Sequence, residues 1–98
     1  MSELFIVVGL EAKEGKEDEL RRDLSALVLP SRSEEGNLSY DLFEDIGEPG
    51  KFVFVEHWSS EELRNKHHTE GPHIQHFHAN GVANVERTAF AGSLRRVV

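Results

Sequence analysis

LFIVVGL, residues 4–10, is the stretch that decides the fold of this chain. Apolar side chains occupy both alternating sets of this strand, with Ile6 on one face and Val7 on the other. The stretch 52–58, FVFVEHW, repeats the pattern, and the two strands are predicted over residues 4–12 and 51–58. Because strands that are apolar on both faces are buried on both sides, the sheet that contains them is expected to be covered on both faces.

The first of two helical regions follows this opening strand. Leucines recur at helical spacing at Leu20, Leu24 and Leu27, which predicts an amphipathic helix with one apolar stripe. Pro30 is expected to close or kink that helix. A second strand is predicted over residues 37–45, where apolar and polar side chains alternate, and a turn rich in glycine and proline joins it to the third.

The second helical region is predicted in two parts. Ser59 and Glu62 form a capping-box signature, in which the Ser59 hydroxyl accepts a hydrogen bond from the Glu62 amide. Residues 69–71 should break this short helix, and Pro72 suits the first position of another. The last strand is predicted over residues 85–94.

The resulting order is β-α-β-β-α-β, which is typical of a ferredoxin-like α+β fold with an antiparallel sheet. Both helical regions then lie on one face of the sheet, and the two-faced strands require a cover for the other face. A second copy of the same sheet is the simplest cover, so we expect a homodimer. The whole chain, residues 1–98, is expected to be a single domain.

The composition excludes several classes of partner. The chain has 11 basic and 18 acidic residues and a net charge of -7, so neither nucleic acid nor an anionic membrane is expected to bind it. It has no cysteine, which excludes a disulfide framework and thiolate chemistry. The apolar start is too short to span a bilayer and lacks the basic flank of a signal peptide, so a cytoplasmic protein is expected.

Three parts of the chain carry a family resemblance. They are the run 31–43, SRSEEGNLSYDLF, the run 52–58, and the histidines His67 and His73. This pattern resembles the antibiotic biosynthesis monooxygenase domain family over nearly the whole chain. The resemblance implies a dimeric α+β barrel, in which two sheets pack face to face and each subunit has a pocket between its sheet and its helices. It also implies cofactor-independent oxidation of a small aromatic, phenolic or quinol substrate by O2.

Histidines and aromatic residues are expected to carry this chemistry. A histidine of near-neutral pKa suits the base that removes a phenolic proton, and His67 and His73 are the predicted catalytic residues. Aromatic walls suit an aromatic ring. The predicted substrate-binding residues are Trp58, Tyr40, Phe43, Phe54 and Arg32. His73 and His76 are spaced to share a metal, yet a surface histidine cluster is the expected interpretation, and neither a metal nor another cofactor is assigned.

Two assignments stay open at this stage. His67 and His73 are one residue further apart than the family spacing, which His68 would restore, so either His67 or His68 occupies the family position. Glu56 falls in the middle of a strand, where a carboxylate needs a partner, and a structural salt bridge with Arg32 is the first expectation.

Two other functions remain as alternatives. One is isomerisation of a small oxygenated metabolite by histidine acid–base chemistry in the same pocket, which Arg32 inside the pocket would favour if the substrate were a sugar phosphate. The other is a dimeric binding or stress-response module without turnover. A pocket too small for a bicyclic ligand, or filled by its own side chains, would favour the second alternative.

Overall fold

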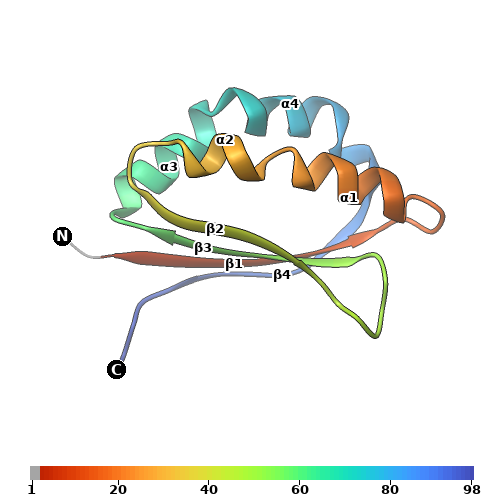
Figure 1. Ribbon diagram of the computed structural model, residues 1–98, viewed down its shortest axis with the longest axis horizontal. Coiled ribbons are helices and arrows are strands. Elements are labelled where there is room, and N and C mark those ends of the chain that lie inside the picture. Colours follow the sequence, from red (N-terminus) through yellow and green to blue (C-terminus); the bar gives the residue numbers. More distant parts are fainter. Residues whose placement is uncertain (1–2) are drawn as a thin grey trace.

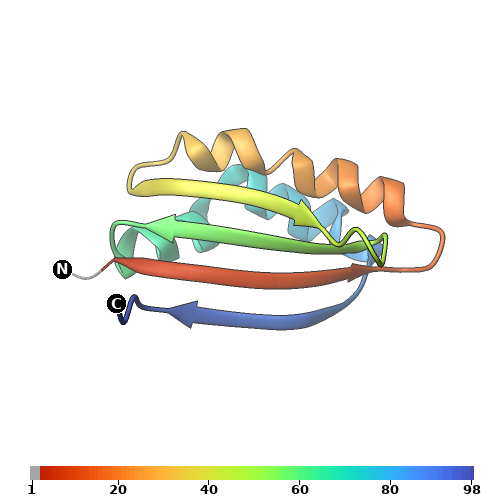
Figure 2. The ribbon, with the colours of Figure 1, turned by 60° about the horizontal axis from the view of Figure 1, so that its bottom comes forward.

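Four antiparallel strands form one sheet in the order β2-β3-β1-β4 (Figure 2). The computed structural model describes residues 3–98. The elements in chain order are β1 (Leu4–Ala12), α1 (Glu17–Ser25), α2 (Val28–Arg32), β2 (Asn37–Glu44), β3 (Lys51–Trp58), α3 (Glu61–Glu70), α4 (Pro72–Asn80), the 3-10 helix η1 (Val82–Asn84) and β4 (Val85–Leu94). This is the ferredoxin-like α+β arrangement predicted from the sequence, which is thereby confirmed.

The helices lie together on one face of the sheet, so that the molecule has two layers (Figure 1). The core between the layers is made of apolar side chains from both. Its buried members are Ile6, Leu20, Leu24, Leu27, Tyr40, Phe52, Phe54, Trp58, Ile74 and Phe77. Burial of each such side chain contributes roughly 1.5 to 3 kcal/mol, so this interface holds the helices on the sheet.

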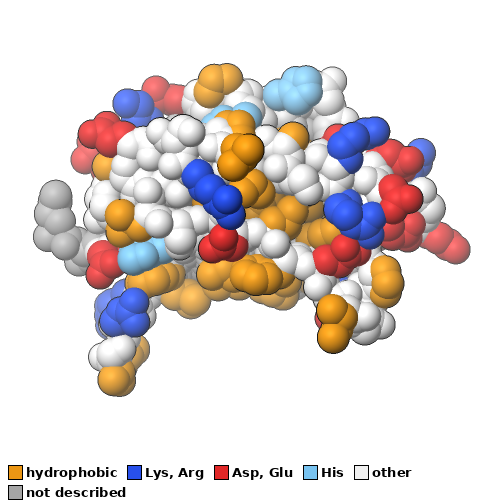
Figure 3. Space-filling model, in the orientation of Figure 1, with side chains coloured by type: hydrophobic (Ala, Val, Ile, Leu, Met, Phe, Trp, Pro, Cys, Tyr) orange, Lys and Arg blue, Asp and Glu red, His pale blue; other side chains and the backbone are white. Residues whose placement is uncertain are grey.

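The opposite face of the sheet is apolar and lies open in the single chain. Its half-exposed side chains include Phe43, Val55, Phe90 and Leu94. The ring of Phe5 stacks on that of His57 on this face, with centroids 4.1 Å apart. Figure 3 shows the apolar band along the underside of the sheet, and Figures 1 and 3 show that the C-terminal end and the β2–β3 turn project below it. The two-faced character of the strands is therefore present in the structure.

The first helical region is divided more sharply than the sequence suggests. α1 ends at Ser25, and a short second helix, α2, starts at Val28. Pro30 lies inside the first turn of α2, where its missing N–H would have had no intrahelical acceptor. Pro30 therefore neither closes nor kinks the first helix, which has already ended.

The capping prediction for α3 is wrong by one residue. Ser60, not Ser59, is the N-cap, and its hydroxyl accepts a hydrogen bond of 3.2 Å from the Leu63 amide. The Ser59 amide is instead bonded to the Gly36 carbonyl at 2.8 Å, which ties it to the start of β2. The break between the two last helices is confined to Gly71, and Pro72 occupies the first turn of α4 as predicted.

Within residues 3–98, no helix combines the length and the apolarity needed to cross a membrane.

Candidate functional site

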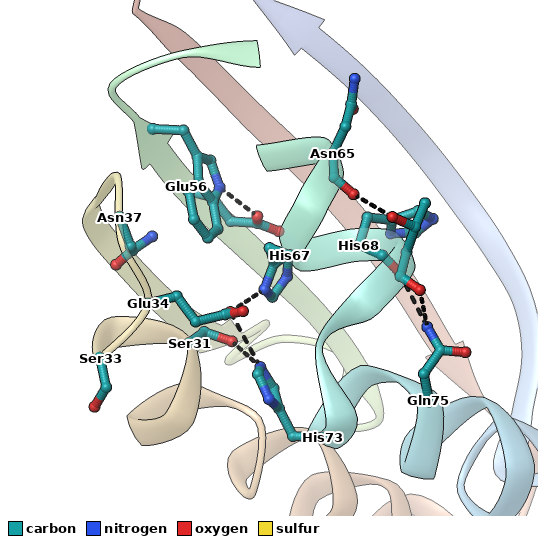
Figure 4. A network of polar contacts seen from close by, with 12 residues as sticks. Ser31, Ser33, Glu34, Asn37, Glu56, Asn65, His67, His68, His73 and Gln75 are labelled. Carbon is teal, nitrogen blue, oxygen red and sulfur yellow. Dashed lines mark hydrogen bonds and ion pairs between the residues drawn. The ribbon is translucent and has the colours of Figure 1, made fainter. Parts of the chain in front are cut away.

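A polar cluster lies where the end of α2, the last turn of α3 and the first turn of α4 meet (Figure 4). The carboxylate of Glu34 contacts Nδ1 of His67 and lies 3.3 Å from Nε2 of His73. The hydroxyl of Ser31 is 3.0 Å from the same Nε2 atom of His73. The predicted catalytic histidines, His67 and His73, are thus brought together by one carboxylate.

Two glycines allow this junction to close. Gly36 has φ of +87°, a left-handed conformation that lets the chain turn from α2 into β2 directly after Glu34. A Cβ atom on Gly71 would lie 2.7 Å from the His67 carbonyl oxygen and 3.4 Å from a Glu34 carboxylate oxygen. Only a residue without a side chain therefore lets α3, α4 and Glu34 approach this closely.

The environment of His67 favours a neutral imidazole in one tautomer. Its side chain is only 4% exposed, and this burial lowers its pKa more than the neighbouring Glu34 carboxylate raises it. Because a carboxylate only accepts hydrogen bonds, the proton of the neutral ring resides on Nδ1, which faces Glu34. Nε2 then carries a free lone pair, as a proton-accepting histidine requires.

A cavity of about 240 Å³ lies between the sheet and the helices, and His67 forms part of its wall. Aromatic side chains from three elements, Tyr40, Phe54 and Phe77, line it together with leucines and valines. Its charged or titratable lining comes from Tyr40 on β2, Glu56 on β3, and residues of α3 and α4. The cavity therefore joins an apolar, aromatic interior to a small number of polar groups, as ligand sites do.

Trp58 on β3 packs against His67, and Glu56 on the same strand is bonded to Trp58. The Trp58 side chain is fully buried, and its ring centroid lies 4.8 Å from that of His67. The Trp58 Nε1–H donates a hydrogen bond of 2.9 Å to Glu56, and burial raises the pKa of the Glu56 carboxyl group. Burial likewise raises the pKa of the Tyr40 hydroxyl, so this residue is a neutral phenol at the wall.

The predicted site residues do not all lie in the wall of this cavity. Tyr40 and Phe54 line the cavity, with ring centroids 5.2 Å apart. Trp58 packs behind His67 and is not part of the cavity wall. His73 belongs to the polar cluster, but the cavity that it lines, of about 270 Å³, is a separate one between α1 and α4.

Phe43 and Arg32 lie outside the cavity. Phe43 is on the open face of the sheet and is 56% exposed, because side chains alternate along β2 and Tyr40 takes the helix side. Arg32 reaches over β2, where it donates to the Tyr40 carbonyl at 3.0 Å and to Asp41 at 2.9 Å. The expected Arg32–Glu56 salt bridge is therefore wrong. Arg32 forms an ion pair with Asp41, and Glu56 accepts a hydrogen bond from the Trp58 indole.

His67 and His68 have different surroundings. His67 is buried in the cluster with Glu34, whereas His68 is exposed, although its ring borders the cavity. His73 and His76, whose spacing would have allowed a shared metal, have different partners: His76 interacts with Asn80 at 3.2 Å and His73 with Ser31.

Glu34 and Ser31 were missed by the sequence reasoning, and so was Arg64, which lines the cavity. Arg64 is three residues before His67 on α3, and residues at this spacing share a helix face, so Arg64 could have been found from its relation to His67. Glu34 follows the end of α2, and no local pattern relates it or Ser31 to the histidines.

The same cluster has the donors of a divalent metal site. Glu34, His67 and His73 each offer one ligand atom, and these atoms lie within 4.8 Å of one another. Two imidazoles and one carboxylate are a donor set used by zinc and by non-haem iron. These three residues are therefore the ones in the described chain that could hold such an ion.

Solved structures share this architecture over nearly the whole chain. The crystal structure of PA3566 from Pseudomonas aeruginosa has a TM-score of 0.93 and 28% identity, covering 100% of this chain and 97% of that one. The structure of Rv0793 from Mycobacterium tuberculosis has a TM-score of 0.89 and 25% identity, covering 99% and 97% of the two chains. Fold and site together define a class of small α+β proteins with a histidine-lined cavity between sheet and helices.

Sequence comparison then names the family. The model of the family described as "Antibiotic biosynthesis monooxygenase" matches residues 4–80. The Bacillus subtilis protein named "Putative monooxygenase YcnE" is 43% identical over 72 residues, which cover 74% of this chain and 75% of that protein. The chain belongs to the antibiotic biosynthesis monooxygenase family, which confirms the resemblance found in the sequence. This membership supports a monooxygenase-like function.

Proposed function

We propose that this protein is a monooxygenase that oxidises a small phenol or hydroquinone with O2 and without a bound metal or organic cofactor. The observation that carries the proposal is the buried His67, whose Nδ1 contacts Glu34 and which forms part of the wall of an aromatic-lined cavity. Tyr40 and Phe54 provide ring surfaces against which a planar substrate packs.

The proposed reaction begins with removal of the phenolic proton by Nε2 of His67. The phenolate is a better electron donor than the phenol, so it reacts with O2 at an adjacent or opposite ring carbon. One oxygen atom enters the ring as a quinone carbonyl, and the other leaves as water with the two displaced hydrogens. Glu34 stabilises the imidazolium that forms on His67, because its carboxylate already accepts the Nδ1 proton.

Oxygen consumption in metal-free buffer tests this reaction. A panel of naphthols, hydroquinones and anthrones is offered to the purified protein, and quinone formation is followed by absorbance. We expect uptake that is strongly reduced in Glu34→Gln and unchanged in His76→Ala, which lies on α4 outside the cavity lined by His67. Absence of uptake with every substrate, from a protein shown to be folded, contradicts the proposal.

The proposal includes a homodimer in which the open faces of two sheets pack together. The half-exposed Phe43, Phe90 and Leu94 support it, since apolar groups on one face mark an interaction surface. We take the covering partner to be a second copy of the chain. Every copy carries the same open apolar sheet face, and a twofold axis brings two such faces together. Light scattering at micromolar concentration should give twice the mass of one chain, and a monomer there contradicts this part.

One observation favours a binding module without turnover as a second candidate. The cavity of about 240 Å³ is smaller than the roughly 300 to 1,000 Å³ of typical small-molecule sites. Ligand binding with no oxygen uptake would identify this case. The isomerase alternative has lost its support, because Arg32 is paired with Asp41 outside the cavity.

A further inference from the structure

Arg64 occupies an unusual position for a charged side chain. It lies on α3, one turn before His67, and is half-buried. It lines the cavity of about 240 Å³ that His67 borders, called the main cavity below, and also a second cavity of about 220 Å³ bounded by β1 and β4. Arg64 is therefore shared by the linings of two cavities.

The charge of Arg64 has no counterion in the described part of the chain. Within residues 3–98 no carboxylate forms an ion pair with it, and its Nε is buried without a hydrogen-bond partner. Its polar contact is a long one of 3.5 Å from Nη1 to Asn65. Arg21, by contrast, makes two hydrogen bonds of 2.8 and 2.6 Å to Glu44. The buried Nε and the absence of an ion pair leave the Arg64 guanidinium with N–H donors available for an anion.

Glu56 does not supply the missing counterion. Although it lines the same cavity, its Oε1 accepts the Trp58 indole N–H, and no ion pair forms with Arg64. Burial raises the pKa of Glu56 more than the Trp58 hydrogen bond and the nearby Arg64 charge lower it, so the charged form of Glu56 is disfavoured even beside Arg64. Arg64 is the only arginine or lysine that lines the main cavity among residues 3–98.

We propose that the main cavity binds an aromatic anion, with a carboxylate or phenolate oxygen on the Arg64 guanidinium and the ring between Tyr40, Phe54 and Phe77. The inference rests on the proposed function only in taking the same cavity as the substrate site. Arg64 and His67 are at i and i+3 on α3, so an anionic oxygen held by Arg64 keeps the ring within reach of the histidine. Arg64 thereby favours phenolic substrates that carry a second, anionic group such as a carboxylate over uncharged ones.

Binding of matched probes tests the proposal without turnover. The dissociation constants of 2-naphthoate, of the neutral 2-naphthalenemethanol and of inorganic phosphate are measured by calorimetry at pH 7.5. We expect naphthoate to bind roughly 10-fold or more tightly than the alcohol, because a hydrogen bond between two charged groups is stronger than one to a neutral hydroxyl. Arg64→Gln should abolish this preference, and Arg64→Lys should restore part of it.

Lys66→Gln is the matched control, because Lys66 is an exposed cation on the same helix. It should leave the preference unchanged, and circular dichroism checks that every variant is folded. Equal affinity for naphthoate and the alcohol overturns the proposal, as does an unaltered preference in Arg64→Gln. Phosphate binding without naphthoate binding also overturns it, in favour of a phosphorylated ligand. If the preference is found but no phenol is oxidised, the proposed oxygenase reaction alone has failed.

Discussion

The carboxylate of Glu34, which follows α2, contacts Nδ1 of His67 in α3, across 33 positions of the sequence. This contact fixes the tautomer of a buried imidazole and leaves Nε2 as its proton acceptor. The same carboxylate lies 3.3 Å from His73, so one acidic side chain holds the last turn of α3 and the first turn of α4 against the end of α2.

Replacing Glu34 by Gln should therefore lower both activity and stability. The amide has nearly the same shape but no charge, so it no longer stabilises an imidazolium on His67. We expect oxygen uptake to fall by about 10-fold or more, and the free energy of unfolding to fall by about 1.5 to 3 kcal/mol, the range for a charge-assisted hydrogen bond. Steady-state oxygen electrode measurements and urea denaturation check the two effects. Wild-type kcat in a folded Glu34→Gln protein would contradict the role of Glu34.

Stability should depend on pH through His67. Burial lowers the folded-state pKa of His67, so just below the ordinary value of about 6.5 the unfolded chain binds a proton that the folded chain excludes. The contribution of the neutral, buried His67 to the free energy of unfolding is therefore fully present above about pH 6.5. It is lost as the pH falls from that value towards the lower folded-state pKa. Of the charged groups near His67, Glu34 raises its pKa, whereas His73 and Arg64 lower it. Together with burial, the net effect is a lowered pKa.

Urea midpoints measured between pH 7.5 and pH 5 check this dependence. His67→Gln removes the titrating group, so its midpoint should change less over the same range than that of the wild type. The carboxylates common to both proteins contribute equally to the two curves. Parallel curves would show that His67 does not control the acid sensitivity.

The turn at Gly36 should be sensitive to any side chain. Gly36→Ala places a Cβ at φ of +87° and within 2.5 Å of a Leu63 methyl group. We expect a loss of about 1 to 3 kcal/mol in the free energy of unfolding, from backbone strain and from the displaced Leu63 together. Gly15→Ala is the matched control, because Gly15 has φ of +82° but nothing within 4 Å of its Cβ position. A cost for Gly36→Ala no larger than that for Gly15→Ala would mean that Leu63 moves freely.

The open sheet face should lose its self-association when a charge is placed in it. Val55 on β3 lies across from Val7 on β1, in the two inner strands of the sheet. Val55→Lys should convert the proposed dimer into a monomer, because burial of an unpaired ammonium group is unfavourable. Leu29→Lys is the control on α2, where Leu29 is 70% exposed on the helix side. Sedimentation should give half the mass for Val55→Lys alone, and an unchanged dimer would place the interface elsewhere.

Local patterns in the sequence determined the strands and the ends of several helices. β1 and β3 have the predicted bounds, because alternation with period two is a property of consecutive residues. Pro72 begins α4 for an equally local reason, its fixed φ and missing N–H. Alternation along β2 also separates Tyr40 from Phe43, so the exposed position of Phe43 was already implied by the sequence.

The register between strands required the tertiary structure. The irregularity between Asn37 and Ser39 leaves Leu38 exposed, although alternation groups it with the buried Tyr40. Leu38 is an additional residue in β2 that faces no partner residue in β3. Its position depends on the pairing with β3 and on the Gly36 turn, rather than on the sequence of β2 alone. The choice of Ser60 over Ser59 as the cap of α3 has the same origin, since the Ser59 amide is bonded to Gly36.

In the candidate site, too, some features follow from the sequence and others from the tertiary structure. The sequence by itself supplied the two histidines and two aromatic residues of the cavity wall, Tyr40 and Phe54, because residue type and family pattern are visible without a fold. Only the tertiary structure decided that Glu34 orients His67, that Arg32 turns away to Asp41, and that Arg64 enters the cavity unpaired. These are contacts between elements distant in the chain, and their geometry is set by how the helices pack on the twisted sheet, which no local pattern encodes.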